Sequence, residues 1–282
     1  MSPRFAPRRM LGRTGFAATA LGQGDLADRA AGLEACAAIL RRALDAGVNV
    51  VDTAPAYEDG FSEEVVGAAL RGRRAGVFLV DKVDHLDAPV APQVDGSLRR
   101  LGLPWVDLLA LHSVSTPEAW RRAAAPGGAL DALEEEVRRG RARFRGLSSH
   151  HPDVLGAALD DGRCDVLLFP VGARAHPRYA REILPRARAL GVGTIGFKAF
   201  GAGKLIADSE GYGRPSARGL PRLSVETCLR YALTRDPDVA LLGLSTPAEQ
   251  DEAFAAAARF APMSEDELAA TERCAAAAAR GK

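Results

Sequence analysis

Four polar residues with complementary chemistry stand at or just beyond the ends of apolar runs in this sequence. Asp52, Lys82 and His112 each end such a run, and Tyr57 lies shortly after Asp52. An acid, an amine and an imidazole can together tune the acidity of a phenol, whose reference pKa is about 10. The residue types therefore indicate an enzyme whose reaction includes proton donation.

The apolar runs have the composition of parallel strands that are buried on both faces. Segments of this kind alternate with amphipathic, helix-like segments along the chain. The strand candidates are residues 18–21, 48–52, 77–82, 106–112, 144–148, 166–170, 193–197 and 239–243. The helix candidates are residues 33–46, 62–71, 91–101, 130–139, 152–159, 179–190, 225–234 and 247–259.

Eight strand–helix units are the number that closes a barrel, so the sequence predicts an α/β fold with a (β/α)8 barrel as a single domain over residues 1–282. Residues 10–16 predict a short N-terminal β-hairpin, and Ser264 with Glu267 resembles the capping box of a C-terminal extra helix. Every strand of a parallel barrel delivers its carboxyl end to the same rim. We therefore expect the four polar residues to meet at that rim.

The composition is that of a soluble globular protein, with 47% hydrophobic residues, 26% charged residues and a net charge of +1. The near-neutral charge disfavours a nucleic-acid partner, which would need a basic patch. The sequence shows neither a signal-peptide core nor a run approaching the ~18 apolar residues of a membrane span, so we expect a cytoplasmic protein with no membrane partner. The 4 cysteines are widely spaced, which favours reduced thiols over a zinc site or disulfides. No pattern indicates the oligomeric state.

Three stretches of the chain match signatures that occur together and in this order. Residues 52–67 resemble DTAxxYG…SE…LG, residues 97–112 resemble SLxRLxxxxxDLxxxH, and residues 140–149 resemble GKxRxxGxSN. These signatures are those of the aldo-keto reductase family, which the chain resembles over nearly its whole length. Runs at residues 169–171, 196–201 and 228–233 resemble the MPxN, GMKxxxxG and CLRYAL runs of a bacterial subgroup.

The resemblance implies a nicotinamide-dependent oxidoreductase that reduces a small-molecule carbonyl substrate, an aldehyde or ketone, to an alcohol. The cofactor would supply the hydride. Tyr57 would donate the proton, and the Lys82 ammonium would ease that donation by favouring the phenolate. Asp52 would hold Lys82 in place. His112 would orient the carbonyl and donate or relay a hydrogen bond to its oxygen.

Each of these residues also has an ordinary structural interpretation. Asp52 could cap a turn, Lys82 could be a strand-end lysine, and His112 could be a hydrogen-bonded core histidine. Their combination inside the matching motifs favours catalysis. Two other functions stay open: a non-catalytic nicotinamide-binding regulatory subunit on the same fold, and an unrelated barrel enzyme such as a lyase or isomerase. The adjacent His150 and His151 are interpreted as loop residues, and the sequence predicts no metal site.

The cofactor contacts that the resemblance implies lie after the fifth, seventh and eighth strands. The candidates are Ser148, Ser149, Phe197, Lys198, Gly203, Lys204, Leu205, Gly243, Ser245, Thr246, Glu249 and Glu252. The chain departs from the family here, because Ser149 replaces an Asn, Leu168 replaces a Gln and Val171 replaces a stacking aromatic residue. We therefore expect the nicotinamide carboxamide to be held weakly or by other groups.

Members of the family usually bind NADP(H). The residues after the eighth strand predict only a small preference for NADP(H) over NAD(H). Ser245 and Thr246 could donate hydrogen bonds to a phosphate near a helix N-terminus. Glu249, however, stands where many relatives have Arg or Gln. A carboxylate there would repel a 2′-phosphate and could accept a bond from a ribose hydroxyl, so NADP(H) is favoured only narrowly over NAD(H).

A long connection follows the seventh strand. Residues 201–221 contain several Gly and Pro residues, and loops longer than about 12–15 residues are often functional lids. We expect this segment to order over the cofactor pyrophosphate, with Lys198 or Lys204 meeting the phosphate charge. The alternative is a solvated loop.

Overall fold

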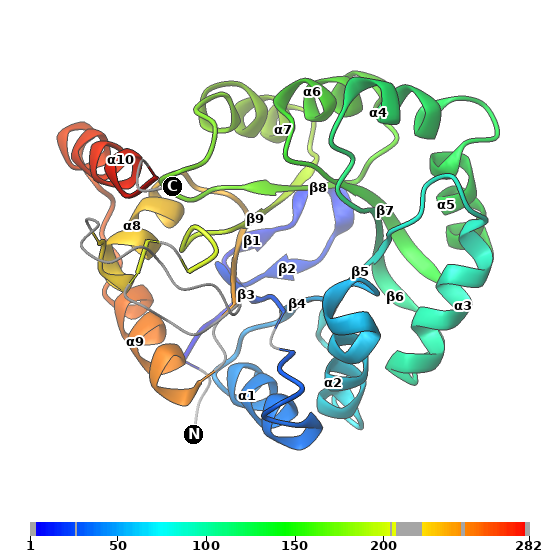
Figure 1. The fold of residues 1–282 in the computed structure, drawn as a ribbon, viewed down its shortest axis with the longest axis horizontal. Helices are drawn as coiled ribbons and strands as arrows, with labels where there is room; N and C mark the ends of the chain where they lie inside the picture. The colour runs from blue at the N-terminus through cyan, green and yellow to red at the C-terminus, as the bar shows by residue number, and fades with distance from the viewer. Residues whose placement is uncertain (1–3, 26, 204, 207–221, 244–245, 280–282) are drawn as a thin grey trace.

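A computed structural model of the chain describes residues 4–25, 27–203, 205–206, 222–243 and 246–279. Eight parallel strands close into a barrel in the order β10-β3-β4-β5-β6-β7-β8-β9 (Figure 1). Their bounds are β3 (Leu21–Gln23), β4 (Val50–Asp52), β5 (Phe78–Val83), β6 (Val106–Leu111), β7 (Ala142–Ser148), β8 (Val166–Pro170), β9 (Gly193–Phe197) and β10 (Val239–Leu242). The ring closes where β10 pairs with β3, so the predicted (β/α)8 barrel is confirmed.

Helices surround the ring of strands (Figure 1). They are α1 (Leu33–Asp45), α2 (Phe61–Leu70), α3 (Val90–Leu101), α4 (Pro117–Ala124), α5 (Ala129–Arg138), α6 (Pro152–Asp161), α7 (Leu184–Ala189), α8 (Val225–Thr234), α9 (Pro247–Ala258) and α10 (Glu265–Ala279). The C-terminal helix α10 lies beyond this ring and is tied to α8 by a 2.7 Å hydrogen bond from the Tyr231 hydroxyl to Glu272. The predicted extra C-terminal helix is therefore confirmed.

The first barrel strand begins later than the sequence predicted. Residues 17–18 form β2 (Ala17–Ala18), which pairs antiparallel with β1 (Arg9–Met10) in the predicted N-terminal hairpin. The barrel strand β3 starts only at Leu21. Between them, the backbone N–H of Thr19 donates to the side chain of Asn49 over 2.8 Å and not to a neighbouring strand. This side-chain bond separates the two short strands.

Two helical segments also differ from the prediction. The connection between β6 and α5 contains an additional helix, α4, whose first turn is capped by Thr116 and begins with Pro117. The predicted helix over residues 179–190 starts as a π-helical turn, Tyr179–Ile183, before α7. Pro185 in the first turn of α7 has no N–H to donate to the preceding turn. This missing donor accounts for the π-helical hydrogen bonds of residues 179–183.

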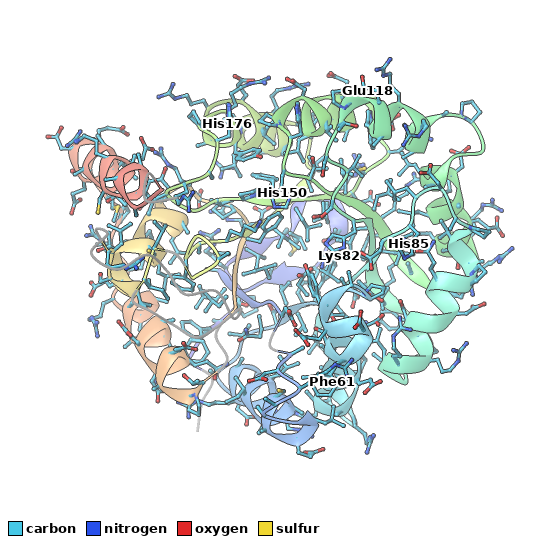
Figure 2. The ribbon with its side chains drawn as sticks, in the orientation of Figure 1. Phe61, Lys82, His85, Glu118, His150 and His176 are labelled. Atoms are coloured by element: carbon cyan, nitrogen blue, oxygen red, sulfur yellow. The ribbon has the colours of Figure 1, made fainter. Side chains whose placement is uncertain are left out.

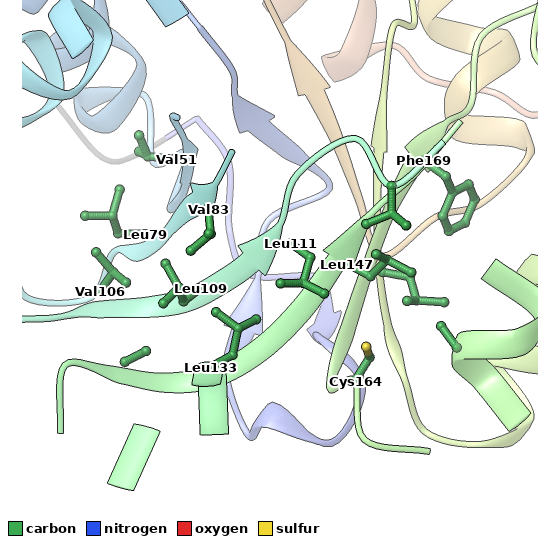
Figure 3. Close-up of a cluster of buried hydrophobic side chains, with 14 of the residues drawn as sticks. Val51, Leu79, Val83, Val106, Leu109, Leu111, Leu133, Leu147, Cys164 and Phe169 are labelled. Atoms are coloured by element: carbon green, nitrogen blue, oxygen red, sulfur yellow. The ribbon is translucent and has the colours of Figure 1, made fainter. Parts of the chain in front are cut away.

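Side chains alternate between the two sides of the barrel wall. Val50, Val80 and Ala110 belong to the cluster inside the barrel. The neighbouring Leu79 and Leu109 belong to the cluster that packs against the helices, part of which is shown in Figure 3. The period of two along each strand therefore decides which residues face the interior.

The N-terminal hairpin contributes to the interior of the barrel. Leu11 is fully buried in the inner cluster, and Phe16 packs against it. The backbone N–H of Arg13 donates to Gly191 over 2.7 Å, just before β9 begins. The hairpin thus covers the end where the strands start and leaves the opposite rim for the candidate site.

Candidate active site

Asp52, Lys82 and His112 reach the open rim because of their position along the strands. Each lies two residues after an interior residue of the same strand run, so its side chain points to the inside of the barrel mouth. Figure 2 shows Lys82 within the ring of strands, whereas Glu118 and His176 lie out at the surrounding helices. Three strand ends therefore bring an acid, an amine and an imidazole to one place.

The ammonium of Lys82 is buried at the centre of this group, with 2% of its side chain exposed. Its Nζ donates to Asp52 Oδ1 and to the backbone oxygen of Thr53, both over 2.7 Å. It also lies 4.6 Å from the centre of the Tyr57 ring. Burial disfavours the charged amine, but Asp52 and Tyr57 outweigh this cost and raise the pKa of Lys82.

Tyr57 is presented by a strained turn between β4 and α2. Glu58 and Asp59 adopt left-handed conformations with φ of 50° and 51°, which side chains other than glycine rarely adopt. The Tyr57 ring meets the His112 ring edge-on, with 5.6 Å between their centres. Burial raises the pKa of Tyr57 to about 12, and the charge of Lys82 opposes this only in part. Lys82 acts on the pKa of Tyr57 in the expected direction, but burial outweighs this effect, and the hydroxyl keeps its proton near neutral pH.

Asp84 also belongs to this group, although it is not among the residues that the sequence predicts for the site. It follows β5 directly, and its carboxylate contacts Nδ1 of His112; both side chains are 13% exposed. Burial raises the pKa of Asp84, but the bond to His112 outweighs it, so that this pKa is lowered. The sequence does contain a signal for Asp84. It stands two residues after Lys82, so its side chain points to the same side of the strand, into the barrel mouth.

Asp25 is a second acid of the group that is not among the predicted site residues. It follows β3 at the same rim, and its Oδ1 accepts from the N–H of Ala27 over 2.9 Å. Burial raises the pKa of Asp25, and the nearby charge of Asp52 adds to this effect. Three successive strand ends thus carry Asp25, Asp52 and Asp84, a pattern that was visible in the sequence.

The predicted cofactor residues after β7 and β9 lie beside the same rim. Ser148 and Ser149 are buried, and the Ser149 hydroxyl donates to the backbone oxygen of Val114 over 2.7 Å. Lys198, which has a left-handed φ of 59°, bonds through Nζ to Nε2 of His150 over 2.8 Å. Burial lowers the pKa of His150 to about 4, and the charge of Lys198 adds to this, so His150 is neutral at neutral pH.

Phe197 belongs to the same neighbourhood, since its ring lies 5.1 Å from that of His150 in an edge-on arrangement. In the view of Figure 2, His150 and Lys82 both lie inside the outer ring of helices. The sequence predicts His150 only as a loop residue and does not indicate its bond to Lys198.

The predicted phosphate site lies at the N-terminus of α9. Thr246 caps this helix: its hydroxyl accepts from the N–H of Glu249 over 3.3 Å, and the Glu249 carboxylate accepts from the N–H of Thr246 over 3.2 Å. This capping box fixes a carboxylate at a helix end that would otherwise favour anions. Gly243 and Glu252 are exposed nearby.

The remaining predicted cofactor residues are only partly described. Gly203 has a φ of 79°, and Leu205 is fully buried in an apolar cluster. Lys204, Ser245 and most of the proposed lid at residues 201–221 lie outside the described residues.

Within the part of the chain that the structure describes, no group of three or more His, Cys, Asp or Glu side chains is arranged to hold a metal ion. Among the same residues, no helix has the length and apolar character needed to cross a bilayer.

Behind the site, a buried pair of acids lies on the helix-facing side of β5. Asp81 and Glu63 are 1% and 0% exposed. Asp81 Oδ2 and Glu63 Oε1 have no hydrogen-bond partner among the described residues, while the other oxygen of Glu63 pairs with Arg100. Burial, followed by the charge of Glu63, raises the pKa of Asp81 to about 8. Asp81 therefore carries a proton at neutral pH.

We predict that Asp81→Asn removes part of the pH dependence of stability. In the unfolded chain an Asp loses its proton at about pH 3.9, whereas folded Asp81 keeps its proton up to about pH 8. Between these values only the folded state holds the proton, so the free energy of unfolding of the wild type falls as pH rises. From pH 6 to pH 8 the variant should gain about 2 kcal/mol relative to the wild type. Urea unfolding at several pH values measures this. Asp87→Asn, at a side chain that is 82% exposed, is the matched control. Parallel pH curves for wild type and Asp81→Asn would contradict the prediction.

A family profile, two curated proteins and a solved structure resemble this chain. The sequence profile of the Aldo/keto reductase family matches residues 19–221. L-galactose dehydrogenase of Arabidopsis thaliana is 25% identical over 297 aligned residues, which cover 94% of this chain and 92% of that protein. Methylglyoxal reductase YeaE of Escherichia coli (strain K12) is 36% identical over 115 residues, but the match covers only 40% of this chain and 38% of that protein.

A solved structure gives the same result at the level of the fold. An aldo-keto reductase from Klebsiella pneumoniae, in complex with NADPH, superimposes with a TM-score of 0.73 at 25% identity. The match covers 95% of each chain.

Proposed function

Because the chain belongs to the aldo/keto reductase family, we propose that it is a nicotinamide-dependent oxidoreductase that reduces an aldehyde or ketone to an alcohol. One observation carries the proposal: the buried Lys82 ammonium bonds to Asp52 at 2.7 Å and lies over the Tyr57 ring at 4.6 Å. This arrangement places a charged amine behind a phenol at the open end of the barrel, beside His112.

The contacts of each residue support a role in this reaction. The reduced nicotinamide, when bound, supplies a hydride to the carbonyl carbon. The electron pair of the carbonyl bond moves to oxygen, which takes the proton of the Tyr57 hydroxyl, and Tyr57 recovers a proton from water. Lys82 stabilises the phenolate that Tyr57 leaves behind, and Asp52 keeps Lys82 charged and fixed. His112 stabilises the negative charge that grows on the carbonyl oxygen.

The described residues suit a dinucleotide in their donor chemistry. Ser148 offers a buried hydroxyl at the end of β7, Lys198 a cation, and α9 a helix N-terminus. The apolar Leu168 and Val171 offer the nicotinamide no hydrogen bond from their side chains. Ser148 would hold the carboxamide, while Lys198 and the start of α9 would meet the phosphates.

We predict that the protein prefers NADPH to NADH by less than about a hundredfold, which is under about 3 kcal/mol. The reason is the Glu249 carboxylate at the N-terminus of α9, close to where a 2′-phosphate would bind. Glu249→Gln retains a side chain that can complete the capping box and removes the charge, so it should increase the NADPH preference. Dissociation constants for both cofactors measure this, with Glu265→Gln on α10 as the control. A larger preference in the wild type would refute the role of Glu249.

The function is tested by mixing the protein with NADPH and measuring first nicotinamide fluorescence and then turnover. Methylglyoxal is one substrate to try, as the name of the E. coli relative suggests, and oxidation of L-galactose with NADP⁺ is another, as the name of the plant relative suggests. Cofactor binding without turnover across a panel of aldehydes and ketones would favour the alternative, a non-catalytic regulatory subunit. The intact catalytic group weighs against that alternative.

A further inference from the structure

Asp84 connects two parts of the candidate site. Its carboxylate contacts Nδ1 of His112, which lies at the end of β6. It also receives a backbone hydrogen bond from Ala56, the residue before Tyr57. Asp84 itself follows the strand that carries Lys82. A single carboxylate therefore positions the imidazole and the turn that presents the phenol.

The contact with Asp84 decides which ring nitrogen of His112 carries a proton. A carboxylate accepts hydrogen bonds, so Nδ1 must be the protonated nitrogen. In a neutral ring the other nitrogen, Nε2, then has a lone pair and can only accept. His112 can donate from Nε2 only after the ring takes up a second proton and becomes an imidazolium.

We propose that Asp84 is a positioning residue that makes His112 a hydrogen-bond donor to the substrate only in the imidazolium form. The proposal rests on the proposed function, in which the carbonyl oxygen receives bonds from Tyr57 and His112. Asp84 stabilises the imidazolium through its charge, and His112 keeps its proton throughout while Tyr57 gives up its own. A neutral ring would offer the carbonyl oxygen no donor from Nε2, so reduction depends on the imidazolium form.

Three other groups near His112 keep one charge state between about pH 6 and pH 9. Tyr57 keeps its proton to about pH 12, and His150 is neutral above about pH 4. Lys82, paired with Asp52, has a raised pKa and stays charged. Asp25 lies near Tyr57 and Ser62, and burial raises its pKa, so the pH profile is also measured in an Asp25→Asn background.

Asp81 has a pKa of about 8, but it faces the helices on the other side of β5. Measuring the pH profile also in an Asp81→Asn background removes its contribution.

The first test reads the tautomer directly and does not depend on activity. Protein labelled with ¹⁵N-histidine is titrated by NMR, and the His112 signals are identified among the 5 histidines by their loss in His112→Gln. We expect the neutral wild-type ring to carry its proton on Nδ1. In Asp84→Asn the amide can donate to Nδ1, so the proton should move to Nε2, as it does when the Asp of a serine-protease triad is replaced by Asn. A neutral wild-type ring protonated on Nε2 would overturn the proposal.

The second test follows reduction of 4-nitrobenzaldehyde by NADPH between about pH 6 and pH 9. The wild type should slow with rising pH. Asp84→Asn should be at least about tenfold slower near pH 6, because the stabilising charge is lost, and should then be nearly independent of pH, because the neutral ring now donates from Nε2. Asp84→Ser, whose hydroxyl can also donate to Nδ1, carries the same expectation if the Asn variant does not fold. Asp87→Asn, in the same loop and 82% exposed, should keep the wild-type profile.

The outcomes separate the two proposals. If Asp84→Asn keeps the wild-type pH slope, the role of Asp84 is wrong even though the enzyme is active. If the wild type reduces no carbonyl compound at all, the proposed function fails, and the NMR titration still decides the role of Asp84.

Discussion

Replacing Tyr57 by Phe should lower the rate of carbonyl reduction by about 10²–10⁴-fold while leaving NADPH binding intact. Phe keeps the ring that packs over Lys82 and edge-on against His112, and it removes only the hydroxyl. Because that hydroxyl stays protonated to about pH 12, it is available as a proton donor across the whole range of an ordinary assay. The loss should therefore appear at every pH tested.

Stopped-flow single turnovers measure the chemical step, and quenching or enhancement of nicotinamide fluorescence measures binding. Tyr179→Phe is the matched control, since it removes a hydroxyl from a buried tyrosine that packs against Phe169 away from the site, with 5.5 Å between the ring centres. A Tyr57→Phe enzyme that keeps more than about half of the wild-type rate in the chemical step would show that another group is the acid.

Replacing Lys82 by Met should damage both catalysis and stability. The ammonium that stabilises the Tyr57 phenolate is lost, so the rate should fall by about as much as in Tyr57→Phe. The buried carboxylate of Asp52 also loses its partner at 2.7 Å, and breaking a buried ion pair from one side costs about 3–5 kcal/mol. The free energy of unfolding in urea and the rate of reduction at saturating substrate measure the two effects.

The double variant Asp52→Asn with Lys82→Met separates these effects. It removes both charges, so it should recover most of the lost free energy of unfolding and none of the lost activity. Recovery of both together would mean that Lys82 supports only the fold. If the double variant recovers neither stability nor activity, the uncompensated charge of Asp52 is not the cause of the instability.

The architecture was predictable because it depends on patterns that are local in the sequence. The Val- and Leu-rich runs that end at Asp52, Lys82 and His112 determine both the strands and the direction of these side chains. The capping box at Ser264 and Glu267 likewise predicted α10. In the structure the Glu267 N–H donates to the Ser264 hydroxyl over 3.3 Å. Each of these signals lies within a few residues of what it predicts.

The features that were missed depend on contacts between distant parts of the chain. The late start of β3 follows from a bond between Thr19 and Asn49. The bond between Asp84 and His112 crosses from one strand end to the next, and Lys198 reaches His150 from two strands away. The raised pKa of Tyr57 reflects burial, which outweighs the opposing charge of Lys82.

Asp81 and Lys82 are neighbours in the chain, yet they serve opposite sides of one wall, the acid among the helices and the amine in the barrel mouth. Adding or deleting one residue within β5 would exchange them and also displace Asp84 from His112. The same change would turn the apolar side chains of β5 from the barrel interior to the helices, and those facing the helices to the interior. Length changes in β5 should therefore be eliminated by selection even where substitutions of its apolar residues are accepted, and insertions that diversify the substrate range should fall in the connections beyond the strand ends.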